Sequence, residues 1–213
     1  MNKNRSSRRD LMREELAHLA ARLMAKDGIT DYAFAKRKAA RQMGATETQH
    51  MPSNEEIDVA LQTFRALYES ESHPLVLQQL RQQALAVMKV LKPFHPYLTG
   101  SVLNGSAGEQ SDINLIIYTD DEKSAMMFLL KHNIPFTGAE WRVHSGGKER
   151  AVPCFTWYTA SNVLVSLAVL PENARHSGNR KPATCVDEEA LATLLEKNTA
   201  AEEVMLHEDT MRR

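Results

Sequence analysis

Residues 98–115 read LTGSVLNGSAGEQSDINL and combine residue types that can hold phosphate or a metal ion. Gly100 and Ser101 follow a short apolar stretch, and Asp112 opens a second apolar stretch after a gap of ten residues. Glycine lets the backbone approach a ligand closely, and a carboxylate is a good ligand for a hard cation. The stretch is therefore a catalytic metal site, the remnant of one, or an ordinary connection between two strands.

A second candidate is the basic stretch AKRKAAR, which carries Lys36, Arg37, Lys38 and Arg41. Residues 1–50 hold eleven Lys and Arg against six Asp and Glu, a net charge of +5, whereas the whole chain carries −1. This asymmetry favours contact with a phosphate backbone, and RNA is the nucleic acid we expect. The alternative is a solvated helix face, and no ladder of aromatic residues for base stacking accompanies the charges.

The bulk composition limits the compartment and the class of protein. The chain has 213 residues, of which 43% are hydrophobic and 25% charged, and no apolar run approaches the roughly 20 residues that span a bilayer. The basic start of the chain is not followed by the apolar segment of a secretory signal. Cys154 and Cys185 have neither a metal-ligand spacing nor a spacing that favours a disulfide. We expect a cytoplasmic protein without a membrane segment.

Helices are expected throughout the first part of the chain. Apolar residues recur at helical spacing from Leu16 to a stop at Gly28, and a second helix occupies DYAFAKRKAARQMG, residues 31–44, with Gly44 as its stop. Ser53 followed three residues later by Glu56 is a capping box that opens a third helix. A fourth helix is expected from about residue 74 to residue 91.

Short strands are expected after residue 97, in YLTG, INLIIY, EWRVH, VPCFTW and VLVSLAVL. Gly146 and Gly147 suit a hairpin turn, and Thr119 is expected to cap the one helix that lies among these strands. A last helix is expected over residues 187–197. The fold class is therefore α+β, with a basic helical region over residues 1–72 and a small mixed-sheet domain over residues 73–213.

The Gly-Ser pair, the ten-residue gap and the acid at a strand start resemble the signature of the DNA polymerase β-type nucleotidyltransferase superfamily. That resemblance implies a helix before the Gly-Ser strand, a second acid two residues after the first, and a third acid on a later strand of the same sheet. In such a site the carboxylates hold two divalent ions about 3.5–4 Å apart, which neutralise the attacking and leaving oxygens. Gly100 and Ser101 would then approach the triphosphate.

The sequence departs from this signature at two of the three acids. Asp112 matches the first, but Asn114 stands at the second position and Ser166 at the position expected for the third. Glu109, Asp120 and Glu140 could substitute, although none has the strand spacing of the signature. The helical half also resembles a group of bacterial proteins that join such a region to a nucleotidyltransferase-like domain. A degenerate member of the superfamily is therefore the leading interpretation.

The sequence thus predicts a nucleotidyltransferase-like protein with an incomplete metal site, which binds a nucleotide or RNA in a regulatory or scaffolding role. The first alternative is an active enzyme that transfers a nucleoside monophosphate to RNA, protein or a small molecule, with Asp112 as the main Mg²⁺ ligand. The second alternative is a protein–protein adaptor in which the old pocket is a remnant. The directions in which Asp112, Asn114 and Ser166 point are the deciding geometry.

Overall fold

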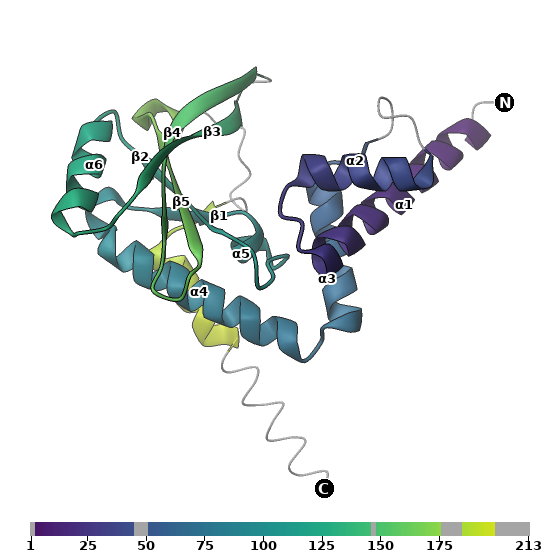
Figure 1. Ribbon diagram of the computed structural model, residues 1–213, viewed down its shortest axis with the longest axis horizontal. Helices are drawn as coiled ribbons and strands as arrows, with labels where there is room; N and C mark the ends of the chain where they lie inside the picture. The colour runs from purple at the N-terminus through teal and green to yellow at the C-terminus, as the bar shows by residue number, and fades with distance from the viewer. Residues whose placement is uncertain (1–2, 45–50, 146–147, 176–184, 199–213) are drawn as a thin grey trace, which may run out of the picture. The chain divides into compact units, whose positions relative to one another are not determined.

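The computed structural model describes residues 3–44, 51–145, 148–175 and 185–198. The chain is a helical N-terminal region followed by a mixed β-sheet with its own helices, so the expected α+β class is confirmed (Figure 1). Within the described ranges, no helix is both long enough and apolar enough to cross a membrane.

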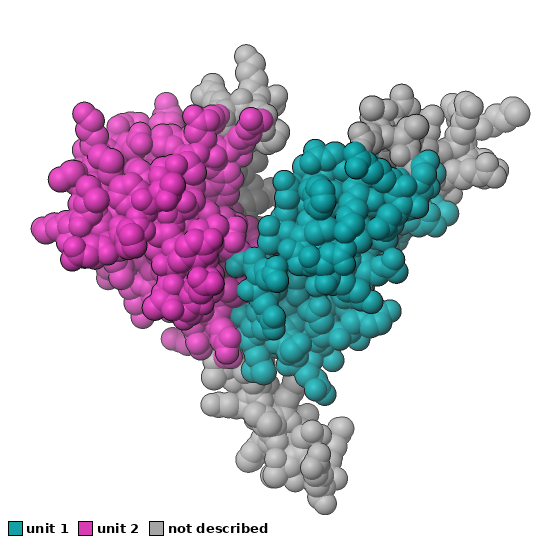
Figure 2. Space-filling model, in the orientation of Figure 1, with its two compact units in different colours: residues 1–77, 104–111 teal, residues 78–103, 112–213 magenta. Residues whose placement is uncertain are grey.

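Two compact units divide the chain (Figure 2). The first unit is formed by residues 1–77 and 104–111, and the second by residues 78–103 and 112–213. The division therefore falls inside helix α4, Ser72–Val90, and the loop 104–111 joins the first unit although both its neighbours in sequence belong to the second. The predicted domain boundary after residue 72 stays a prediction, because compactness does not show that a fragment folds alone.

The first unit consists of α1 (Lys3–Asp27), α2 (Tyr32–Met43), α3 (Asn54–Tyr68) and the start of α4. Local signals set the ends of these helices. Asp31 accepts a hydrogen bond from the Phe34 amide at the start of α2, and Gly44 ends α2 in the left-handed conformation with φ 63°. The capping box of Ser53 and Glu56 forms at the start of α3 as expected. The core of this unit is rich in alanine, which allows close helix packing.

The second unit is built on a six-stranded sheet in the order β3-β4-β5-β2-β1-β6. The strands are β1 (Tyr97–Thr99), β2 (Ile113–Tyr118), β3 (Thr137–Ser145), β4 (Lys148–Tyr158), β5 (Leu164–Leu170) and β6 (Cys185–Val186). β2 and β5 are parallel neighbours, and the other neighbouring pairs are antiparallel. The predicted turn at Gly146 and Gly147 lies outside the described residues, between strands that pair as an antiparallel hairpin.

Helices complete the second unit: the rest of α4, the short α5 (Ser101–Asn104), α6 (Glu122–Lys131), and a helix over residues 188–198. Two one-turn 3₁₀ helices, η1 (Lys92–Phe94) and η2 (Glu172–Arg175), follow α4 and β5. One prediction is wrong in detail. Asp121, not Thr119, caps α6 by accepting from the Ser124 amide, while the Thr119 hydroxyl accepts from the Asp121 amide and shapes the turn before it.

The two faces of the central strands differ in burial. On β2 the side chains of Ile113, Leu115 and Ile117 are fully buried, and Val165 and Leu167 of β5 are buried beside them. Residues of the opposite face alternate with these along each strand. Near the start of β2 and β5 that opposite face is only half-buried, so one side of the sheet remains accessible there.

Candidate functional site

The strand register brings Asn114 and Ser166 side by side. They are direct partners in the parallel pair of β2 and β5, Thr99 of β1 lies opposite Asn114, and Thr156 of β4 lies opposite Ser166. Partners in register project from the same face of a sheet. The alignment extends across all six strands, and we call its members the polar row: Thr137, Thr156, Ser166, Asn114, Thr99 and Cys185.

The polar row is accessible, whereas the residues that flank it along β2 and β5 are not. Asn114 and Ser166 are both half-buried, while Ile113, Leu115 and Val165 are fully buried on the other face. Among the described residues, the side chains of Asn114 and Ser166 have no hydrogen-bond partner. Their donors and acceptors are therefore free to bind a ligand that approaches from the accessible face.

Gly100 packs directly against Asn114. Its φ of 76° lies in the left-handed region, and a Cβ at this position would lie 3.0 Å from Nδ2 of Asn114. Only glycine adopts this backbone conformation and fits this close to Asn114 without strain. Gly100 therefore ends β1 and directs the chain into α5, whose first residue is the half-buried Ser101. The structure thus gathers the predicted residues Gly100, Asn114 and Ser166 into one place.

Arg81 of α4 holds α5 in position. The side chain is buried; its Nε donates to the carbonyl oxygen of Val102 and its Nη2 to that of Leu103, both at 3.0 Å. These bonds satisfy carbonyl groups that a four-residue helix cannot satisfy itself. Burial lowers the pKa of the Arg81 guanidinium. The sequence signal was an arginine on the apolar stripe of α4, one turn from Leu77 and Ala84.

Asp112 lies immediately before β2, two residues from Asn114. The side chain is half-buried, and this burial raises the pKa of its carboxyl group. Within the described ranges it has no ion-pair or hydrogen-bond partner that would offset the cost of burial. A half-buried carboxylate without a partner is costly to maintain, which favours a role in binding over one in stability.

The described residues contain no group of three or more His, Cys, Asp or Glu side chains that converge as a metal site. None of the three possible substitutes is on the strands that carry Asn114 and Ser166. Glu109 is in the loop 104–111, and Asp120 follows the far end of β2, where its carboxylate accepts from the Glu172 amide at 3.3 Å. Glu140 is three residues from Thr137 on β3, so alternation gives it the face opposite the polar row. Asp112 is thus the carboxylate that the predicted site retains.

The basic residues of α2 have unequal environments. Lys38 forms an ion pair with Asp27, with Nζ 2.7 Å from Oδ2. Partial burial lowers the pKa of Lys36, which Glu55 and Glu56 partly oppose. Arg37 and Arg41 are exposed and one helical turn apart. Lys38 is therefore engaged within the first unit and Lys36 is partly buried, so Arg37 and Arg41 are the stronger candidates for phosphate contact.

Asp58 of α3 fixes the loop 104–111 inside the first unit. Its carboxylate accepts hydrogen bonds from the hydroxyl of Tyr32, from Oγ of Ser106 at 2.8 Å and from Nδ2 of Asn104 at 2.9 Å. Burial raises the pKa of Asp58, and the hydrogen bonds oppose that rise. A carboxylate with three donors at a helix–loop junction is a structural anchor, and the sequence pattern gave no sign of it.

Further contacts hold the same loop. Nε2 of Gln62 donates to the Asn104 carbonyl oxygen at 2.6 Å, and the His73 ring is 2.9 Å from the Ala107 carbonyl oxygen. The buried guanidinium of Arg65 lies against Gly108, where an added Cβ would come within 2.4 Å of it. Gly108 therefore allows this loop to pack against an arginine of the first unit.

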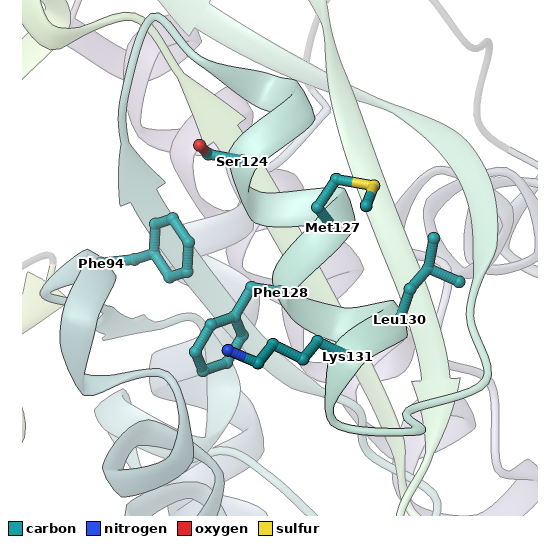
Figure 3. Close-up of a pocket in the computed structure, with 6 residues that line it drawn as sticks. All are labelled: Phe94, Ser124, Met127, Phe128, Leu130 and Lys131. Atoms are coloured by element: carbon teal, nitrogen blue, oxygen red, sulfur yellow. The ribbon is translucent and has the colours of Figure 1, made fainter.

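A surface pocket lies over η1 and α6 of the second unit (Figure 3). Its lining consists of Phe94, Ser124, Met127, Phe128, Leu130 and Lys131. The rings of Phe94 and Phe128 meet edge to face with centroids 5.2 Å apart. Met127 and Leu130 are more than half exposed. None of the residues predicted for the site lines this pocket, and its apolar lining suits contact with another apolar surface more than catalysis.

Comparison with protein-family models, with curated proteins and with solved structures found no significant match, so the evidence for function is the geometry of this chain itself.

Proposed function

We propose that this protein is a degenerate nucleotidyltransferase-like protein that binds a nucleotide or RNA in a regulatory or scaffolding role. The observation that carries the proposal is the register of Asn114 and Ser166 on adjacent parallel strands, with Gly100 in contact with Asn114. The resemblance in sequence implies acids at the positions of Asp112, Asn114 and Ser166. These positions are distant in sequence, and Asn114 and Ser166 are neighbours on the accessible face of the sheet. Their neutral side chains support binding without transfer.

We propose a cytoplasmic location for the protein, where a nucleotide or RNA partner is present. Cys154 is buried, and burial raises the pKa of its thiol to about 11. A thiol that resists ionisation is poorly reactive, which supports a reduced Cys154 in that compartment.

Calorimetric titration of the full chain with each of the four ribonucleoside triphosphates tests whether the polar row binds a nucleotide. We expect binding to one or more nucleotides, and a loss of about fivefold in affinity for Asn114→Ala and for Ser166→Ala, because each removes a hydrogen bond worth about 1 kcal/mol. Thr193→Val, on the helix over residues 188–198, changes a hydroxyl outside the polar row and should leave affinity unchanged. Loss of affinity in all three variants alike would contradict the assignment.

An active transferase is the second candidate, and the retained half-buried Asp112 is the observation that favours it. Incubation with labelled nucleoside triphosphates and Mg²⁺ or Mn²⁺ measures transfer to protein or RNA. Label incorporation that disappears in Asp112→Ala would establish transfer and overturn the degenerate interpretation.

A protein–protein adaptor is the third candidate. The exposed Met127 and Leu130 beside the α6 pocket favour it, because they present apolar surface without a partner in the described part of the chain. The absence of any thermal shift at millimolar nucleotide would favour this candidate over both others.

A further inference from the structure

We propose that Asn114 and Ser166 of the polar row contact the phosphate groups of the ligand directly, without a divalent cation between them. The inference rests on the proposed function, that is, on the row being a nucleotide site. It follows from a mismatch between the cation that the family resemblance implies and the side chains that occupy the site.

The donor set does not suit a pair of Mg²⁺ ions. Such ions take several carboxylates from adjacent strands. Near the start of β2 and β5 the structure offers the carboxylate of Asp112, the amide of Asn114 and the hydroxyl of Ser166. An amide oxygen and a hydroxyl can each lend a lone pair, but they supply no negative charge to balance four positive charges.

The same donor set suits an anion. An ionised carboxylate only accepts hydrogen bonds, whereas the Asn114 amide and the Ser166 hydroxyl can each donate. A site with three carboxylates repels a polyphosphate unless metal ions intervene, and replacing two of them by neutral donors removes most of that repulsion. The two changes thus convert a cation site into one that can bind phosphate oxygens directly.

The geometry places these donors where a ligand can reach them. Adjacent strands are about 4.8 Å apart, so the backbones of Asn114 and Ser166 have that spacing and both side chains project from the accessible face. Thr156 is less available because its hydroxyl donates to the Thr137 carbonyl oxygen at 3.3 Å. Gly100 has no Cβ to crowd Nδ2 of Asn114, which an added Cβ would approach to 3.0 Å. Asp112 remains beside them, immediately before β2.

The first experiment measures nucleotide affinity of the full chain by calorimetry, with ATP, GTP, CTP and UTP as probes, in excess EDTA and in excess MgCl₂. We expect the tightest nucleotide to bind with dissociation constants that agree within about threefold in the two buffers. Binding that needs Mg²⁺, or gains more than about tenfold from it, would overturn this inference and leave the proposed function standing. Failure of every nucleotide to bind in either buffer would overturn both.

The second experiment restores one carboxylate. Asn114→Asp is nearly isosteric and should weaken nucleotide binding in EDTA by about tenfold or more, while MgCl₂ should recover most of the loss. Asn114→Ala removes the donor without adding charge, so its loss should be the same in both buffers. Asn54→Asp makes the same chemical change at the exposed start of α3 and should bind as the unmodified chain does.

Unfolding midpoints of the three variants separate a loss of fold from a loss of binding. If Asn114→Asp keeps its fold and binds in EDTA as tightly as the unmodified chain, Asn114 does not face phosphate and the inference is wrong. If Asn114→Asp unfolds, the Asn114→Ala variant decides, since equal affinity of that variant and the unmodified chain would overturn the inference equally.

Discussion

The contribution of Asp112 to the free energy of unfolding depends on pH, and the direction of this dependence follows from its raised pKa. Burial raises its pKa, so the folded state binds the proton more tightly than the unfolded state does. The stabilisation by the neutral carboxyl is complete below the unfolded pKa of about 3.9 and is lost as the pH rises through the higher folded pKa. Ionised Asp112 therefore destabilises the folded state at neutral pH.

We expect Asp112→Asn to be more stable than the unmodified chain at pH 7 and to lose this advantage as the pH falls toward 4. Unfolding midpoints from calorimetry across this range measure the difference between the two proteins. A more stable unmodified chain at pH 7 would mean that Asp112 has a stabilising partner.

Substitution of three glycines by alanine can distinguish destabilisation by steric clash from destabilisation by backbone strain. At Gly108 an added Cβ would meet the Arg65 guanidinium at 2.4 to 2.7 Å, and this side chain is buried and paired with Glu69, so it cannot swing away freely. Gly44 has open space around it but a φ of 63°. Gly138 has open space and no positive φ.

We expect Gly108→Ala to destabilise the chain by about 1–3 kcal/mol through overpacking, and Gly44→Ala by about 1 kcal/mol through backbone strain. Gly138→Ala should change stability by less than about 0.5 kcal/mol. Urea unfolding followed by circular dichroism gives the three free energies. A neutral Gly108→Ala would show that Arg65 does not pack on the loop as described.

At the scale of elements, the loop 104–111 depends on one carboxylate. Asp58→Ala leaves Tyr32, Ser106 and Asn104 without their shared acceptor, so we expect a loss of about 2 kcal/mol and faster amide hydrogen exchange in residues 104–111. Asp27→Ala breaks the exposed ion pair with Lys38 and should cost less than about 1 kcal/mol without affecting the loop. Unchanged exchange in the loop of Asp58→Ala would contradict the anchoring role.

The sequence predicted the elements whose signals are local. The Ser53–Glu56 capping box and the stop at Gly44 need only neighbouring residues, and both form as expected. Where two caps compete within three residues, as at Thr119 and Asp121, spacing alone chose the wrong one. The place of the loop 104–111 was not predictable, because Asp58 and Ser106 are 48 residues apart and no periodicity links them.

The candidate site was predictable in part. The sequence identified β2 and β5 as the strands of the site, from the residue types at 112, 114 and 166 and from the order of the elements. The polar row as a whole required the register, because Thr99 and Thr156 join it only through their partners Asn114 and Ser166. The place of Arg81 on the apolar stripe of α4 is visible in the sequence, but no sequence pattern marks the backbone carbonyl groups that it binds.

At the scale of the whole molecule, charge is segregated along the chain. Residues 1–50 carry +5 and the remainder carries −6. Such segregation steers an anionic partner to one part of a protein that is almost neutral overall. Internal ion pairs reduce the effect, since Lys38 binds Asp27 and Arg13 binds Glu56 at 2.8 Å. The charge that remains available on α2 is carried mainly by Arg37 and Arg41.

If RNA is the partner, its affinity should fall steeply with salt, and the double variant Arg37→Glu, Arg41→Glu should weaken it at least tenfold. Because two phosphate contacts are removed, the slope of log affinity against log salt should flatten by about 1.4 for a single strand. Lys89→Glu with Lys92→Glu makes the same charge change at exposed positions of the second unit and should have a much smaller effect. Fluorescence polarisation with a labelled single strand and a labelled hairpin measures both quantities. Affinity that is flat with salt and equal in the two double variants would remove RNA from the proposed function and leave the nucleotide as its ligand.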